Sequence, residues 1–173
     1  QGGRGTGLAI YGNAITGARV DSNTVQGILG DGITLDGSIT NPVQMLYNVI
    51  ADNDANGLWT SVPVSGQYNT IVRNAGGGAT LMGGSTFRLG NYVGNGHNAV
   101  TAYSGGPVVA DSSFWGGATG PRCATGCDVA GGDSVGPNVT FLPFDTTLVV
   151  GAPPIPNPLP APTTRPKARY RNQ

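Results

Sequence analysis

Residues 47–61 read YNVIADNDANGLWTS, and this stretch decides the fold. It begins near Asn48, passes two aliphatic residues, turns at Asp52-Asn53-Asp54 and opens a second apolar run after Gly57. Taken alone, the two aspartates predict a metal loop or a pair of acid/base carboxylates. Taken with the neighbouring segments, the same residues form one part of a repeat.

An asparagine recurs along the chain in SNTV, YNVI, YNTI and GNYV, at spacings of 25, 21 and 22 residues. A further step of 21 residues reaches Ser112. An apolar residue follows each anchor by two positions and is β-branched in four cases of five, which suits an inward-facing strand position. The anchors are Asn23, Asn48, Asn69 and Asn91, and the apolar residues are Val25, Ile50, Ile71, Val93 and Phe114.

A second register runs in parallel with the first. The segments GLAIY, GITLD, GLWTS, GATLM and NAVTA begin at residues 7, 32, 57, 78 and 98. Apolar residues alternate within them and keep their phase from one repeat to the next, which indicates a sheet with one face inside. The first inward column is Leu8, Ile33, Leu58, Ala79 and Ala99, and the second is Ile10, Leu35, Thr60, Leu81 and Thr101.

Composition agrees with an all-β solenoid. The chain has 30 Gly among 173 residues, no Glu, and only 10% charged residues, so it lacks the usual material of helix surfaces. Each repeat is too short to bury its own face and must stack on the next one. We therefore predict a parallel β-helix of about five to six rungs, in which the asparagine column bonds from rung to rung. A leucine-rich repeat is the alternative, because residues 20–25 (VDSNTV) resemble its motif, but Leu is sparse and Gly abundant.

The repeat resembles right-handed parallel β-helices of the pectate-lyase-like type over about residues 5–145. The rung period, the N-x-[IV] column and the terminal stretch FWGGATGP…GGDSVGPNVTFLPF carry this resemblance. It implies a secreted or surface protein with a right-handed coil. Function does not follow from it, because the fold hosts lyases, hydrolases, adhesins and phage spikes.

The chain divides at residue 150 into a β-helix domain (1–150) and a proline-rich tail (151–173). Seven of the 23 tail residues are Pro, which predicts an extended polyproline II conformation. The tail carries four basic residues and no acid, whereas the domain carries nine Asp and five Arg. This asymmetry predicts either a tail that meets an acidic surface or a solubilising end.

No residue pattern predicts catalysis. Asp52 and Asp54 lie in a corner with no acid above or below them, so a turn role is expected, with calcium as the alternative. His97 stands alone in another corner, and the motifs of galacturonan hydrolases are absent. Trp59 and Tyr11 are expected on an outer sheet face with Asp36 nearby, where they could stack on sugar rings or contact a protein.

The remaining features concern location and partners. Cys123 and Cys127, in RCATGC, are expected to form a disulfide-closed loop, with two free thiols as the alternative; a disulfide would imply an extracellular or cell-surface location. No apolar run is long enough to span a membrane, and nucleic-acid binding is not expected because the body is acidic and the excess of basic residues is confined to the short tail. Because Gly7 opens a strand with no helix before it, the first rung should expose open sheet edges. We therefore expect a non-catalytic structural or adhesive module that assembles into homo-oligomers or filaments, with a polysaccharide-processing or glycan-binding module as the alternative.

Overall fold

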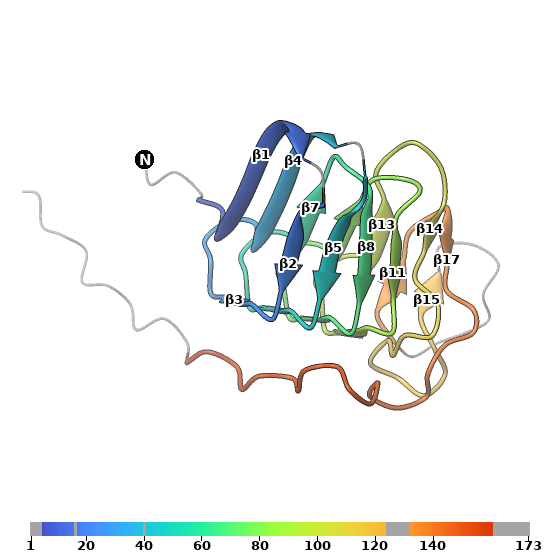
Figure 1. Ribbon diagram of the computed structural model, residues 1–173. Coiled ribbons are helices and arrows are strands. Elements are labelled where there is room, and N and C mark those ends of the chain that lie inside the picture. Colours follow the sequence, from blue (N-terminus) through green and yellow to red (C-terminus); the bar gives the residue numbers. More distant parts are fainter. Residues whose placement is uncertain (1–4, 16, 40, 124–131, 161–173) are drawn as a thin grey trace, which may run out of the picture.

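The structure, a computed structural model, describes residues 5–15, 17–39, 41–123 and 132–160. These residues form an all-β solenoid of about four turns in which every strand pair is parallel and no helix occurs (Figure 1). The predicted all-β parallel β-helix is confirmed at this level. The predicted count of five to six rungs stays a prediction.

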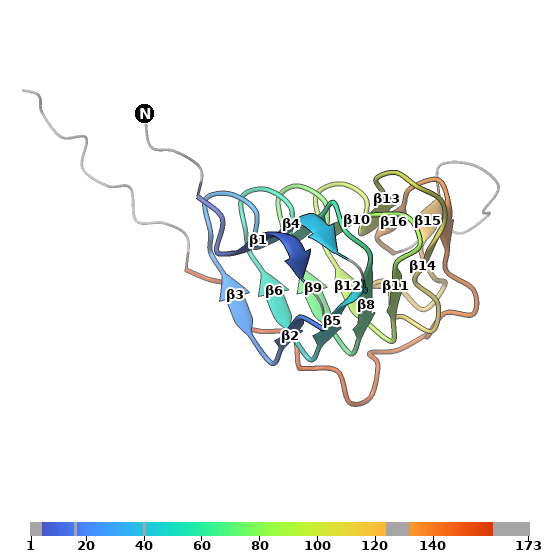
Figure 2. The same ribbon diagram turned by 45° about the horizontal axis from the view of Figure 1, so that its top comes forward.

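Three parallel sheets form the sides of the solenoid, and each of the first four turns contributes one strand to each sheet (Figure 2). Sheet A contains β1 (Leu8–Ile15), β4 (Ile33–Ile39), β7 (Leu58–Thr60), β10 (Ala79–Leu81), β13 (Val100–Ala102), β16 (Ser134–Val135) and β15 (Arg122–Cys123) in spatial order. Sheet B runs from β2 (Arg19–Asp21) through β5 (Val43–Leu46), β8 (Val64–Gln67), β11 (Thr86–Arg88) and β14 (Val108–Val109) to β17 (Val139–Thr140). Sheet C contains β3 (Thr24–Gln26), β6 (Val49–Ala51), β9 (Thr70–Val72) and β12 (Asn91–Val93).

The core lies inside the three sheets and is filled by in-register columns. Ile50 pairs with Ile71 between β6 and β9, and both side chains are 0% exposed. Toward the last turns the same column becomes aromatic: Tyr92 stacks on Trp115 with ring centroids 4.7 Å apart. The buried Tyr92 hydroxyl donates to the carbonyl of Phe87 at 3.1 Å, and burial raises the Tyr92 pKa.

A ladder of three asparagines lies at the corner between sheets B and C. Asn23 donates from its backbone N and from Nδ2 to Oδ1 of Asn48, both at 3.1 Å. Asn48 donates in the same two ways to Oδ1 of Asn69, at 3.0 and 2.9 Å. The residues just before the three asparagines turn the chain with a positive φ: Ser22, Tyr47 and Tyr68. The ladder thus satisfies backbone groups that the corner removes from the sheets.

Asn91 does not belong to this ladder. It pairs with Thr70, one position beyond Asn69, and its Oδ1 accepts a bond from the Val149 backbone N at 2.9 Å. Gly90 takes the ladder position, and its N donates to the Ser113 hydroxyl at 3.0 Å. The predicted column is therefore one residue late in the fourth turn and one residue early in the next. Tyr92 and Trp115, rather than Val93 and Phe114, continue the column of Ile71.

A second ladder, which the sequence analysis missed, lies at the corner between sheets C and A. Asn53 donates from N and Nδ2 to Oδ1 of Asn74 at 3.2 and 2.8 Å. Asn74 donates to Oδ1 of Asn95 at 3.2 and 3.0 Å, and Asn95 donates to Oδ2 of Asp133 at 3.0 and 2.8 Å. A spacing of 21 residues between the three asparagines was the available signal.

The second ladder explains why glycine opens the strands of sheet A. A Cβ on Gly57 would lie 2.7 Å from Nδ2 of Asn74 and 2.7 Å from the carbonyl O of Gly78. Ala99 occupies the corresponding position in a later turn, and Val100 pairs with Ala79. The predicted pairing of Ala79 with Ala99, and of Leu81 with Thr101, is thus also displaced by one residue.

Residues 149–160 lie along the outer face of sheet C. In Figure 1 this segment, in orange to red, runs beneath the solenoid from its far end back toward β3. Ile155 packs with the outward side chains of Val49, Ala51 and Val72. The described part of the proline-rich tail is therefore held against the domain itself.

Candidate functional site

The predicted metal corner contains an ion pair. Asp52 and Arg73 occupy the same corner position in successive turns, each with a positive φ, 53° and 54°. Arg73 donates from Nε to Oδ1 of Asp52 at 2.7 Å and from Nη2 to Oδ2 at 2.9 Å. Gln26 donates to the same Oδ2 at 2.7 Å. The Arg73 hydrogen bond, with smaller help from Gln26 and against the opposing effect of burial, lowers the Asp52 pKa.

This geometry bears on the calcium prediction. Both carboxylate oxygens of Asp52 already accept bonds, and a cation at that carboxylate would meet the guanidinium charge of Arg73. Asp54 is exposed, and its backbone N donates to the carbonyl of Ile28 at 2.8 Å. No group of three or more potential metal ligands occurs within the described residues. Calcium binding at Asp52 and Asp54 stays a prediction.

The outer face of sheet A brings together the three predicted ligand-binding residues. Tyr11 pairs with Asp36 across β1 and β4, and Asp36 accepts a hydrogen bond from Ser61, two residues after Trp59. Tyr11 is 65% exposed and Trp59 is half-buried. Tyr103, 55% exposed, meets Trp59 edge-on with ring centroids 5.6 Å apart.

Sequence reasoning missed Tyr103 because of the one-residue displacement in the fifth strand of sheet A. With the observed register, Trp59, Thr80 and Thr101 form one outward column, and Tyr103 follows two residues later on the same side. The face presents the rings of Tyr11, Trp59 and Tyr103 beside the carboxylate of Asp36. Such a surface could stack on sugar rings or contact a protein.

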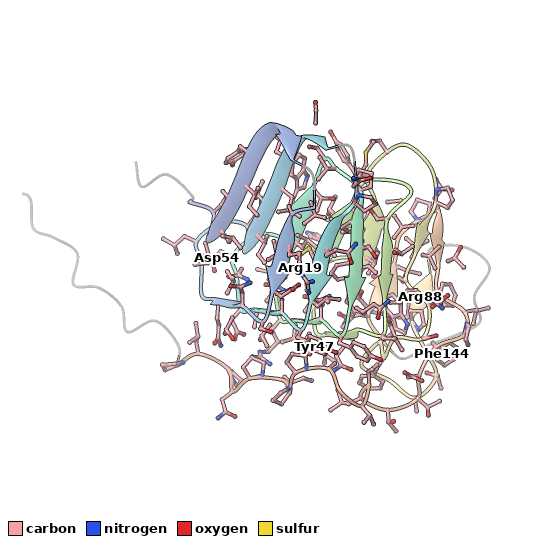
Figure 3. All side chains as sticks on the ribbon, viewed as in Figure 1. Arg19, Tyr47, Asp54, Arg88 and Phe144 are labelled. Carbon is pink, nitrogen blue, oxygen red and sulfur yellow. The ribbon has the colours of Figure 1, made fainter. Side chains whose placement is uncertain are left out.

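Charged side chains elsewhere on the described surface are mostly paired within the chain. Arg19 contacts Asp21, and Arg88 contacts Asp111. Figure 3 labels Arg19 and Arg88, which come from β2 and β11 of sheet B. His97 is exposed, and its backbone N donates to Gly76 at 3.0 Å.

The first turn exposes one edge of all three sheets. β1, β2 and β3 each lie at the end of their sheet, and no other described strand pairs with their outer sides. Leu8 and Val25 are half-buried there, whereas Ile33 and Ile50 in the next turn are 0% exposed. Oδ1 of Asn48 and Oδ1 of Asn69 each accept from the preceding turn, whereas no described residue donates to Oδ1 of Asn23. This edge has the chemistry to receive another turn.

The two remaining predictions concern the cysteine pair and a membrane span. Cys127 lies outside the described residues, and so does the predicted Cys123–Cys127 disulfide. In the part of the chain that the structure describes, no helix is long and apolar enough to cross a membrane.

The comparisons with known proteins add no family. The chain matches no protein-family model, no curated protein and no solved structure. The class that its own geometry defines is a β-solenoid with parallel sheets.

Proposed function

We propose that the protein is a non-catalytic structural or adhesive module that assembles with copies of itself through the first-turn edge, the outer sides of β1, β2 and β3. The observation that carries this proposal is that all three sheets end at this one turn with their edges unpaired within the described residues. Unpaired strand edges readily add strands from a second molecule. The partly exposed Leu8 and Val25 would become buried in such a contact.

The open ladder position gives the contact specificity. Asn23 can accept at Oδ1 the same kind of N–H bond that Asn48 and Asn69 accept inside the solenoid. A second copy bringing its own first turn would offer backbone N–H groups at the edge. Two copies related by a two-fold axis would thus form a closed contact. An extracellular or surface location would suit a structural or adhesive module of this kind.

Sedimentation velocity at tens of micromolar tests this assembly. The wild-type chain should sediment as a dimer or larger species. Thr24 is exposed on β3. Backbone groups of alternate residues there face the second turn: Asn23 O accepts from Val49 N, and Gly27 N donates to Ala51 O. Thr24 is out of phase with these residues. Its own N–H should therefore face outward. Thr24→Pro should shift the protein toward monomer, whereas the matched Thr24→Ala should not; a monomeric wild type contradicts the proposal.

A glycan-binding role for sheet A is the second candidate, and the Trp59–Tyr103 contact favours it. Aromatic rings on an exposed sheet face can stack on sugar rings, and Asp36 could bond to hydroxyl groups. Affinity electrophoresis against acidic and neutral polysaccharides tests this role. Retardation that Trp59→Ala abolishes and that Tyr47→Ala, on another face, preserves would support it. Equal mobility with and without every polysaccharide would exclude it for that panel.

A further inference from the structure

The outer face of sheet C holds the chain's own tail through a specific set of contacts. Thr70 Oγ1 donates to the carbonyl O of Pro153 at 2.5 Å. Arg73 Nη2 donates to the carbonyl O of Pro156 at 3.0 Å, and Gln26 Nε2 donates to that of Asn157 at 3.2 Å. Three side chains from two turns therefore contact three backbone carbonyls of one extended segment.

This pattern matches the chemistry of a proline-rich segment. Proline has no N–H, so an extended proline-rich segment offers mainly carbonyl acceptors and cannot join a sheet as a regular strand. The sheet C face supplies the donors that such a segment needs. Its backbone is also restricted before binding, so less conformational entropy is lost on contact.

The donors are held in place by other side chains of the domain. Asp52 accepts bonds from both Gln26 and Arg73, which fixes the two donors beside each other. Thr70 is 0% exposed, and Nδ2 of Asn91 donates to its hydroxyl at 3.4 Å. The site is thus organised by interactions within sheet C and its corners.

Apolar contacts select the residues between the prolines. Ile155 packs on the cluster formed by Val49, Ala51 and Val72. Leu159 lies over Gly27, where a Cβ would come within 2.5 Å of its Cδ1. Gly151 lies against the ring of Tyr68, with 3.7 Å between Cε1 and the position of an added Cβ. The carbonyl hydrogen bonds and the side-chain contacts together are specific for a segment of the form G-x-P-x-I-P-N-x-L.

We propose that this face, defined as the outer side of sheet C with Gln26, Thr70 and Arg73, is a binding site for extended proline-rich segments. Residues 151–159 of the same chain occupy it in cis, and the same segment of a second copy can occupy it in trans. Thr146, Thr147 and Leu148, which precede the segment, are exposed and allow it to leave without disturbing the core. Covalent attachment favours the cis segment, so trans binding requires its displacement.

Fluorescence anisotropy with a labelled peptide of residues 149–160 tests the site in the full chain. The Ile155→Asp/Leu159→Asp chain, whose own tail loses both apolar contacts, should bind the wild-type peptide at least tenfold more tightly than the wild-type chain does. A peptide carrying the same two substitutions should bind at least tenfold more weakly than the wild-type peptide. Absence of saturable binding, or equal affinity of the two chains for the wild-type peptide, would overturn the proposal.

A second variant distinguishes specific recognition of the peptide from nonspecific apolar binding. Adding Thr70→Val to the Ile155→Asp/Leu159→Asp chain removes one donor while conserving side-chain shape, and should weaken peptide binding at least fivefold. Circular dichroism checks that this chain retains its strands. Unchanged affinity in a folded Thr70→Val chain would contradict donor recognition. Sedimentation velocity of the same chains reports the edge contact separately, so failure of the edge contact is distinguishable from failure of this site.

Discussion

The middle turns and the far end of the solenoid solve the same packing problem in two ways. In the middle turns, Asn48 and Asn69 repeat one polar side chain at one corner and bond to each other. At the far end the ladder position passes to Gly90 and Ser113, and the neighbouring inward column changes from Ile71 to Tyr92 and Trp115. Repetition stabilises the middle, whereas large buried rings fill the end. The difference shows that a solenoid needs the same residue in successive turns only where that side chain bonds to the equivalent side chain of the next turn.

The largest expected effect comes from removing the aromatic end. Trp115 is 0% exposed and stacks on Tyr92. Trp115→Ala should lower the free energy of unfolding by about 3–5 kcal/mol, because it removes buried apolar contacts and leaves a cavity. Urea unfolding followed by circular dichroism measures the change. A loss below about 1 kcal/mol would show that the far end is not packed as described.

The next effect contrasts an asparagine inside the ladder with one outside it. Asn69→Ala leaves the N and Nδ2 of buried Asn48 without their acceptor and should cost about 2–4 kcal/mol. Asn91→Ala removes mainly the bond to Val149 N and should cost about 1 kcal/mol. Equal losses in urea unfolding would place both residues in one ladder and remove the distinction between the two regions.

Adding a methyl group beside the second ladder compares a middle turn with a later turn at equivalent positions, Gly57 and Ala99. Gly57→Ala brings a Cβ within 2.7 Å of Asn74 Nδ2 and should cost about 1–3 kcal/mol by overpacking. Ala99→Gly is the matched reverse change in a later turn, where alanine is already accommodated, and should cost about 1 kcal/mol or less. Thermal unfolding of both variants gives the order. A Gly57→Ala chain as stable as the wild type would contradict the close approach.

The smallest effect concerns the ion pair between turns. The folded-state pKa of Asp52 is lowered, so its contribution to stability is present above the ordinary Asp pKa of 3.8 and is lost as the pH falls through the lower folded value. Asp52→Asn should therefore cost at most about 1 kcal/mol at pH 7, because the pair is partly exposed, and the difference from wild type should shrink below pH 3.8. Asp54→Asn is the control with the same charge change at an exposed position. A difference for Asp52→Asn that stays constant down to pH 2 would contradict this linkage.

Sequence reasoning reached the solenoid because its middle turns repeat both spacing and residue type. It slipped by one residue at Asn91 because NYV satisfies the same N-x-[IV] pattern as NVI, although Tyr92 rather than Val93 faces the core. A displacement of one residue exchanges the two faces of a strand. A separate displacement of this kind, in the fifth strand of sheet A, placed Tyr103 on the wrong side of that sheet. The second ladder was recoverable from its 21-residue spacing.

The tail contacts were not recoverable in the same way. Prolines predict an extended conformation for residues 151–160, but they do not say which surface lies opposite. The donor Gln26 comes from a different turn than Thr70 and Arg73, and the three share no local motif. Only the stacking of the turns brings them to one face. Sites that depend on the relative placement of repeats therefore require the register to be known first.

The account depends most on parallel, in-register stacking, and methyl–methyl nuclear Overhauser effects test it most directly. Thr80 and Thr101 are partners on the outer face of sheet A, where neighbouring strands lie about 4.8 Å apart. A labelled chain should show a strong cross-peak between the γ-methyl groups of Thr80 and Thr101. A strong cross-peak from Thr80 to the Val100 methyls instead, with none to Thr101, would contradict the register that places Trp59, Thr80 and Thr101 in one outward column.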